Sequence, residues 1–141
     1  MTAFYKEVVI DSLVWIGAFS GRDQYRKASK AIFDSFLKGD ISKVYINDYI
    51  LLETVNFLLR KESFDSALLV FDLLLTSRNI ELVYIDEIML KDAKNLFQTY
   101  KNFSLTDCSI IALMKEKGIK HLFSFDSGFD KVKGIIRKEE I

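Results

Sequence analysis

The chain of 141 residues contains no proline, one cysteine and one histidine. Without proline, repeats or a low-complexity tract, nothing marks a linker, and we expect residues 1–141 to form a single domain. The lone cysteine, Cys108, excludes an internal disulfide and fits a reducing compartment, so we expect a cytoplasmic protein whose thiol packs in the core. The single histidine, His121, lies in a strand pattern and is assigned a structural or surface role.

The chain also lacks net charge and long apolar runs. Its 20 basic and 20 acidic residues cancel, which argues against broad, sequence-independent DNA binding. No apolar run approaches the roughly 20 residues of a membrane helix, and the first residues show no signal-peptide pattern, so we expect no membrane contact. Two clusters of basic residues do occur, and they either contact phosphates or form solvated helix faces. The first comprises Arg22, Arg26, Lys27 and Lys30, and the second comprises Arg60 and Lys61.

Short apolar runs alternate with amphipathic stretches along the sequence. The runs predict four strands, or five if the last is counted: 8–10, 43–46, 81–85, 120–125 and 134–136. The periodic stretches predict helices that begin at capping residues and often end at glycine: 12–21, 24–37, 48–59, 63–75, 86–100 and 104–117. This alternation predicts an α/β fold, a three-layer sandwich with a central, mostly parallel sheet of four to five strands flanked by helices.

Four acidic residues stand in apolar sequence, where a buried carboxylate needs a partner. Asp11 and Asp126 each close a predicted strand. Glu53 lies about two turns into the helix after the second strand, and Asp107 lies in the first turn of the helix before the fourth. Because parallel sheets bind ligands at the carboxyl ends of their strands, we expect these acids to face one crevice.

Carboxylates that converge in this way need either separation or a counter-charge. Two carboxylates about 5 Å apart repel by about 3 kcal/mol at an effective dielectric constant near 20. A hard divalent cation would neutralise that repulsion. Oxygen ligands without paired histidines or cysteines favour Mg²⁺ or Mn²⁺ over zinc.

Each acid also has a simpler interpretation. Asp11 can cap a helix, as can Ser12, and Asp107 lies where the helix dipole favours an acid. Glu53 can be a solvated helix residue, and Asp130 fits a surface turn as well as a metal site. Capping alone does not explain four acids directed at one crevice, so we favour the metal site. An aspartyl phosphatase would need a second Asp two residues after the first, but Leu13 occupies that position.

Four segments of the chain carry a resemblance to a known family: Val8–Ser12, the helix around Glu53, Ser104–Asp107 and Ser124–Asp130. In their order and spacing they resemble the PIN domain (PilT N-terminus) ribonuclease family, and within it the VapC-like toxins of type II toxin-antitoxin systems. The resemblance spans the whole chain and implies a PIN-like fold.

The resemblance assigns roles to individual positions. Asp11, Glu53, Asp107 and Asp126 match the four acids that hold one or two Mg²⁺ or Mn²⁺ ions in the family. Asp130 stands where some members place a fifth acidic ligand. Supporting hydroxyl groups come from Ser12 and Thr106, beside the first and third acids.

The resemblance also implies a function, a metal-dependent endoribonuclease that hydrolyses RNA phosphodiester bonds, acting as the toxin of a toxin-antitoxin pair. The alternatives are a PIN-fold RNA- or protein-binding module without turnover and a housekeeping RNA-processing nuclease. The resemblance suggests a small antitoxin protein as partner. A homodimer is expected from the residues themselves, because the helices around 50–59 and 67–75 are apolar on more than one face.

Overall fold

The computed structural model describes residues 3–141, which form one five-stranded sheet with helices on both sides. Along the chain the elements are β1 (Tyr5–Ile10), α1 (Ser12–Phe19), α2 (Arg26–Lys38), β2 (Ile41–Asn47), α3 (Asp48–Lys61), α4 (Phe64–Thr76), β3 (Ile80–Val83), α5 (Glu87–Tyr100), α6 (Leu105–Lys117), β4 (His121–Phe123), the 3₁₀ helix η1 (Ser127–Lys131) and β5 (Ile136–Lys138). No helix within residues 3–141 is long and apolar enough to cross a membrane.

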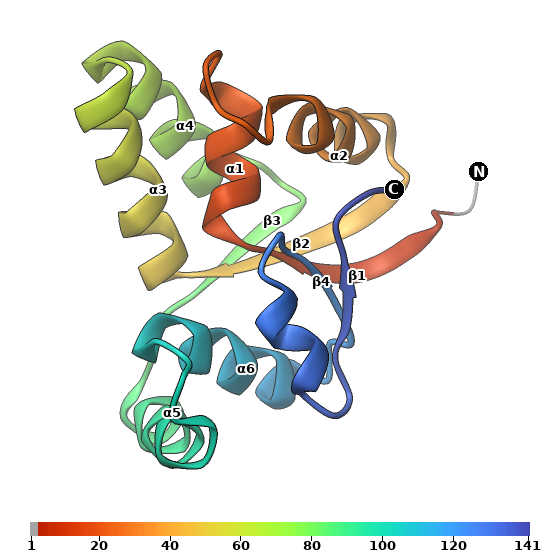
Figure 1. Ribbon diagram of the computed structural model, residues 1–141. Helices are drawn as coiled ribbons and strands as arrows, with labels where there is room; N and C mark the ends of the chain where they lie inside the picture. Colours follow the sequence, from red (N-terminus) through yellow and green to blue (C-terminus); the bar gives the residue numbers. More distant parts are fainter. Residues whose placement is uncertain (1–2) are drawn as a thin grey trace.

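The sheet is parallel throughout, in the order β3-β2-β1-β4-β5. Helices α1 to α4 cover one side of it, whereas α5 and α6 cover the other (Figure 1). The predicted α/β sandwich is therefore confirmed, with five strands. Because the chain runs from β1 outward to β3 and then returns to β4 on the other edge of β1, the switch in direction lies between β1 and β4.

Local signals in the sequence explain where most helices begin and end. Asn47 and Asp86 cap α3 and α5 by accepting hydrogen bonds from the backbone N–H groups of Ile50 and Met89. Gly118 ends α6 with φ of 68°, a left-handed conformation that glycine adopts without a steric penalty. A Cβ on Gly17 would lie 2.2 Å from the hydroxyl oxygen of Ser29, so α1 and α2 approach too closely there for any side chain.

Every strand has at least one boundary that differs from its prediction, and three of the strands bear on the site. β1 begins at Tyr5 instead of residue 8, because its first half is only partly buried and shows no continuous apolar run. β4 ends at Phe123, and Asp126 follows three residues later as the cap of η1, a 3₁₀ helix that was not predicted. β5 is shifted to Ile136–Lys138, since its pairing with β4 sets its register.

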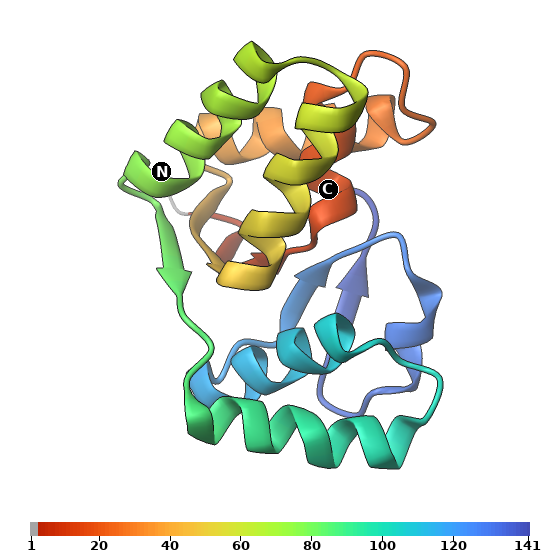
Figure 2. The same cartoon turned by 90° about the vertical axis from the view of Figure 1, so that its left-hand side faces the viewer.

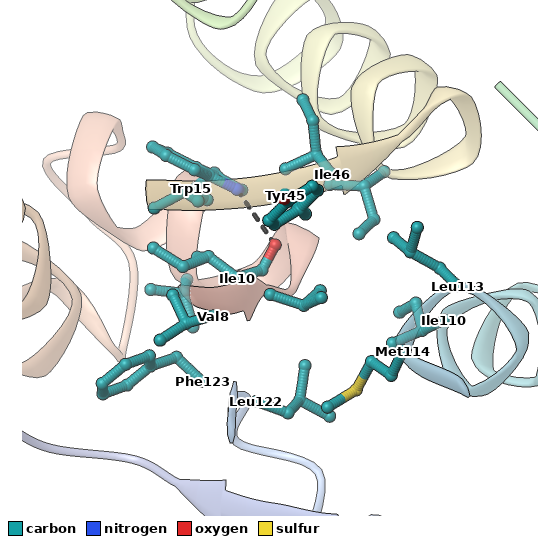
Figure 3. Packing of buried hydrophobic residues seen from close by; sticks show 14 of the residues in the cluster. Val8, Ile10, Trp15, Tyr45, Ile46, Ile110, Leu113, Met114, Leu122 and Phe123 are labelled. Atoms are coloured by element: carbon teal, nitrogen blue, oxygen red, sulfur yellow. Dashed lines mark hydrogen bonds between the residues drawn. The ribbon is translucent and has the colours of Figure 1, made fainter. Parts of the chain in front are cut away.

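The core lies between the sheet and both helical layers. Trp15 of α1 is buried, and its indole Nε1–H donates to the carbonyl oxygen of Ile10 at 3.1 Å (Figure 3). Cys108 is fully buried in α6, and burial raises the pKa of its thiol, as expected for a packed cysteine. The central strands are thus enclosed on both faces, and only their ends reach the surface.

Candidate active site

The candidate active site lies at the carboxyl ends of β1 and β4, where the order of the strands along the chain reverses. Asp11 directly follows β1, and its backbone N–H donates to the carbonyl oxygen of Phe123 at 3.0 Å. Ser124 directly follows β4 and Asp126 comes two residues later. The fold therefore brings residues separated by more than a hundred positions to one edge of the sheet.

Asp11 is the buried end of this site, with 8% of its surface exposed. One carboxylate oxygen accepts from the backbone N–H of Ser12 at 2.8 Å, which also caps α1. The other accepts from the hydroxyl of Ser124 at 2.9 Å. Burial raises the pKa of Asp11 to about 6, the two hydrogen bonds oppose that rise, and the carboxylates of Asp107 and Glu53 add to it.

Glu53 reaches the site from α3, on the helical layer of α1. Its Oε1 accepts from the hydroxyl of Ser12 at 2.5 Å. The same hydroxyl lies 3.5 Å from Oδ1 of Asp11. Ser12 therefore sits between two of the predicted ligands, which is the position expected for a supporting hydroxyl.

Asp107 approaches from the opposite helical layer, in the first turn of α6. It forms a reciprocal capping pair with Ser104: its Oδ2 accepts from the backbone N–H of Ser104, whose hydroxyl oxygen accepts from the N–H of Asp107. Burial raises the pKa of Asp107, the hydrogen bonds to Ser104 lower it, and the charges of Asp126 and Glu53 raise it further. Thr106 lies beside it, and its carbonyl oxygen accepts from the Ser109 hydroxyl.

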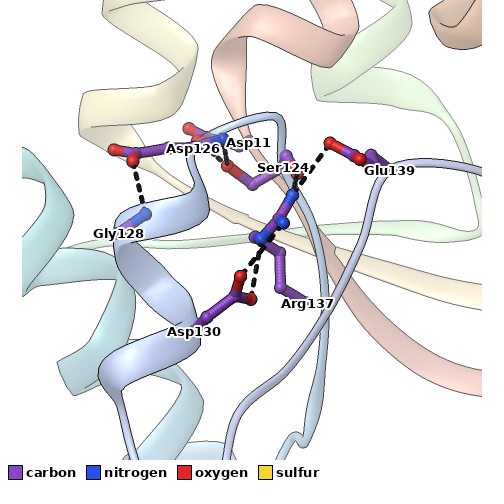
Figure 4. A network of polar contacts seen from close by, with 7 residues as sticks. All are labelled: Asp11, Ser124, Asp126, Gly128, Asp130, Arg137 and Glu139. Atoms are coloured by element: carbon purple, nitrogen blue, oxygen red, sulfur yellow. Dashed lines mark hydrogen bonds and ion pairs between the residues drawn. The ribbon is translucent and has the colours of Figure 1, made fainter.

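Asp126 is exposed and belongs to the turn after β4. Its Oδ1 accepts from the backbone N–H of Gly128 at 2.8 Å, which begins η1. Its own N–H donates to the hydroxyl oxygen of Ser124 at 3.1 Å. Ser124 thus connects Asp11 and Asp126, the acids at the ends of the two central strands (Figure 4).

The four acids share one electrostatic environment, since the carboxylates of Glu53, Asp107 and Asp126 all act on the pKa values of Asp11 or Asp107. Their donor atoms are carboxylate oxygens, which suit a hard cation such as Mg²⁺ or Mn²⁺. Within residues 3–141, however, no three His, Cys, Asp or Glu side chains are yet gathered closely enough to hold one ion together. Occupancy by a metal would therefore require side-chain rotation, which is easiest for the exposed Glu53 and Asp126.

Asp130 is engaged elsewhere. It lies on η1 and forms a two-point ion pair with Arg137, at 2.9 and 3.1 Å, which lowers the pKa of Asp130. Figure 4 shows this pair on the far side of Ser124 from Asp11 and Asp126. The structure does not bring Asp130 together with the four acids.

Two residues at the site were not assigned a role by the sequence analysis, Ser124 and Arg137. Besides binding Asp130, Arg137 donates to the carbonyl oxygen of Ser124 and to the carboxylate of Glu139, both at 3.0 Å. A hydroxyl residue two positions before Asp126 was a usable signal for Ser124. Arg137 carried none, because its contacts depend on how β5 pairs with β4.

Solved structures with the same fold include several toxins and toxin-antitoxin complexes. The toxin VapC20 of Mycobacterium tuberculosis, described as cleaving the sarcin-ricin loop, is similar with a TM-score of 0.80 and 18% identity, covering 91% of this chain and 96% of that one. A toxin-antitoxin complex from Klebsiella pneumoniae matches with a TM-score of 0.69 and 18% identity over 95% and 99% of the two chains. DNA-bound VapBC from Salmonella typhimurium matches at 0.66 and 13% over 94% and 96%.

No curated protein sequence matches the chain. The sequence model of the PIN domain does, and the match runs from residue 8 to residue 135, which includes all four acids and most of the sheet. Together with the shared fold of the solved toxins, this match establishes that the chain belongs to the PIN domain family.

Proposed function

We propose that this protein is a metal-dependent endoribonuclease, the toxin of a toxin-antitoxin pair, with Asp11, Glu53, Asp107 and Asp126 as its catalytic metal ligands. The observation that carries the proposal is the arrangement around Asp11, a buried carboxylate that Ser12 links to Glu53 and Ser124 links to the turn of Asp126. A negatively charged RNA backbone would be repelled by these carboxylates unless a cation lay between them. Membership of the PIN domain family supports the same conclusion.

The chain's own residues prepare the site for such a cation. The backbone N–H of Ser12 and the hydroxyl of Ser124 fix both oxygens of Asp11, so the buried carboxylate is held in one orientation. Glu53 and Asp126 lie at the exposed side, where RNA arrives. A bound divalent ion would supply stabilisation of the charge that develops on the phosphate and activation of water. The protein's own residues therefore orient the buried carboxylate of Asp11 and place Glu53 and Asp126 between it and the solvent.

Cleavage of total RNA with and without Mg²⁺ or Mn²⁺ tests this proposal, with Asp107→Asn as the decisive variant. Asparagine keeps an acceptor for the N–H of Ser104 and so preserves the start of α6. We expect cleavage to require metal and to fall at least about 100-fold in the variant, since even residues that only support metal ligands are worth roughly 10–100-fold.

Asp92→Asn, an exposed acid of α5, is the matched control and should cleave normally. Cleavage in the presence of EDTA, or equal cleavage by Asp107→Asn, would refute the proposed mechanism. A neighbouring reading frame that encodes a short DNA-binding protein would separate a toxin from a housekeeping nuclease. The toxin-antitoxin complexes among the solved relatives support a small antitoxin as partner.

We also propose a homodimer formed through an apolar face on α3 and α4. The two helices pack against each other and lie on one side of the molecule (Figure 2). We define the α3–α4 apolar face by its exposed leucines: Leu52, Leu59, Leu68, Leu69 and Leu75. An exposed apolar surface of this kind is typical of a protein interface.

Leu69→Glu tests the dimer, because Leu69 is 62% exposed and a charge there would be buried in an interface. We expect a shift from dimer to monomer in sedimentation equilibrium, with a dissociation constant raised at least about 100-fold. Leu37→Glu, equally exposed at 63% but on α2, should leave the dimer intact. A wild-type protein that is already monomeric would refute the proposal.

A further inference from the structure

A cavity lies where the start of α2 meets the turn after β4, and its lining includes none of the four acids. Its volume is about 560 Å³, within the range of small-molecule sites. Tyr25 and Phe125 form part of its wall. Phe125 stands in the chain between Ser124, which binds Asp11, and Asp126, so this one residue connects the cavity to the candidate active site.

The two aromatic side chains at this cavity form a flat stack. The ring centroids of Tyr25 and Phe125 are 4.1 Å apart, with an angle of 9° between the ring planes. Other aromatic pairs are less parallel, from 26° between Tyr100 and Phe103 to 76° between Tyr5 and Phe123. Both stacked residues are only half-buried. They present a planar aromatic surface at the edge of the site, outside the tightly buried core.

Polar groups surround this aromatic surface. Lys27 and Gln24 line the cavity from the α2 side, and Glu139 and Glu140 line it from the end of the chain. A nucleobase has a flat face that stacks on aromatic rings and N–H groups at its edge that donate to carboxylates or amides. A nearby phosphate would pair with the ammonium group of Lys27. An apolar peptide side chain would form no hydrogen bond with these polar groups.

Glu139 is also connected to the acids. Its carboxylate binds Arg137, and the same nitrogen of Arg137 donates to the carbonyl oxygen of Ser124. The cavity wall and the acid that Ser124 orients therefore share one hydrogen-bonded network (Figure 4). A ligand in the cavity would be held at a fixed position relative to Asp11.

We propose that this cavity binds an unpaired nucleobase of the RNA substrate, beside the phosphate to be cleaved, with the Tyr25–Phe125 pair as its stacking surface. The inference rests on the proposed ribonuclease function and deepens it. A single-stranded or splayed-out base is required, since a base paired within a helix exposes no face for stacking. Substrates would then be loops or single strands.

Short RNAs that carry one 2-aminopurine at successive positions test this inference, because the fluorescence of that base is quenched when it stacks on an aromatic ring. The protein used is the Asp107→Asn variant, so that the RNA stays intact. We expect quenching at one position. It should be lost with Tyr25→Leu or Phe125→Leu, retained with Tyr25→Phe, and unaffected by Tyr84→Leu, a control at an exposed tyrosine elsewhere.

In the cleavage-competent protein, Tyr25→Leu should weaken RNA binding about 10-fold and raise KM accordingly, while Tyr25→Phe should behave as the wild type. Quenching that survives both leucine variants would overturn the inference, and so would RNA cleavage without quenching at any position. Quenching without any cleavage by the wild type would uphold the base site and refute the nuclease. If the leucine variants impair only capture of a protein partner, the cavity belongs to that partner and the inference fails.

Discussion

Asp11→Asn is expected to abolish RNA cleavage and, at the same time, to stabilise the metal-free protein. Burial raises the pKa of this carboxyl from 3.8 to about 6, so the folded state binds its proton more tightly than the unfolded state does. Above pH 6 the folded protein therefore carries a cost for the buried charge, and below pH 4 that cost vanishes. At about 1.4 kcal/mol per pKa unit, the cost is at most about 3 kcal/mol.

Asparagine removes the charge yet can still accept the hydrogen bond from the N–H of Ser12. We expect Asp11→Asn to raise the free energy of unfolding by about 1–3 kcal/mol at pH 8 in EDTA, and the gain to shrink towards pH 5. Denaturant titrations at both pH values measure it. Cleavage should fall at least about 100-fold. A variant that is less stable than the wild type at pH 8 would contradict the assigned charge cost.

Asp130→Asn is the matched control for that experiment. Asp130 is exposed and its pKa is lowered by Arg137, so its charge favours the folded state above its unfolded pKa and the benefit is lost as the pH falls through its folded pKa. The substitution should therefore bring no gain in stability at pH 8. Cleavage should persist, because Asp130 faces Arg137 instead of the four acids.

Trp15→Ala is expected to be the most damaging single change to the fold. The side chain is 1% exposed and packs at the start of α1 against the sheet. Removing a buried tryptophan costs about 3–5 kcal/mol, a large part of the 5–15 kcal/mol that holds a typical domain folded. The indole also holds the carbonyl of Ile10, the residue before Asp11, so the acid loses part of its support as well.

Trp15→Phe separates packing from hydrogen bonding. It retains most of the apolar volume but leaves the Ile10 carbonyl without its donor, which should cost about 1–3 kcal/mol. Unfolding of both variants has to be followed by circular dichroism, because Trp15 is the only tryptophan and its substitution removes the fluorescence signal. Equal losses from the two substitutions would show that the hydrogen bond, and not the packing, dominates.

The sequence was most informative where local chemistry and burial agree. Apolar runs such as Val44–Ile46 favour strands enclosed on both faces, and glycines such as Gly118 end helices in a left-handed conformation. The apolar run of β1 ends directly before Asp11, so the position of this acid at the carboxyl end of the strand could be predicted together with the fold. η1 was missed although its start is a local hydrogen bond between Asp126 and Gly128. The register of β5 could not be predicted, because it depends on pairing with β4 and not on residue pattern.

The candidate site shows the same division. Its acids were recognisable because carboxylates are rare in apolar sequence. The simpler roles that competed with the metal interpretation are also present: Asp11 caps α1, and Asp107 lies in the first turn of α6, where it pairs with the cap residue Ser104. Capping does not exclude the proposed metal role, because an ionised carboxylate has about four lone-pair sites and Asp11 and Asp107 use only some of them for hydrogen bonds. The hydrogen-bonded network from Glu139 through Arg137 to Ser124 could not be predicted from the sequence, because its members come together only through β4–β5 pairing.

The strand order also decides when the candidate site comes into existence during synthesis. β1 is the central strand and is made first, but one of its edges stays open until β4, which is made near the end, docks against it. Until then Asp11 has neither Ser124 nor Asp126 beside it. A growing chain therefore carries an incomplete set of acids, and the candidate site cannot form until β4 docks against β1.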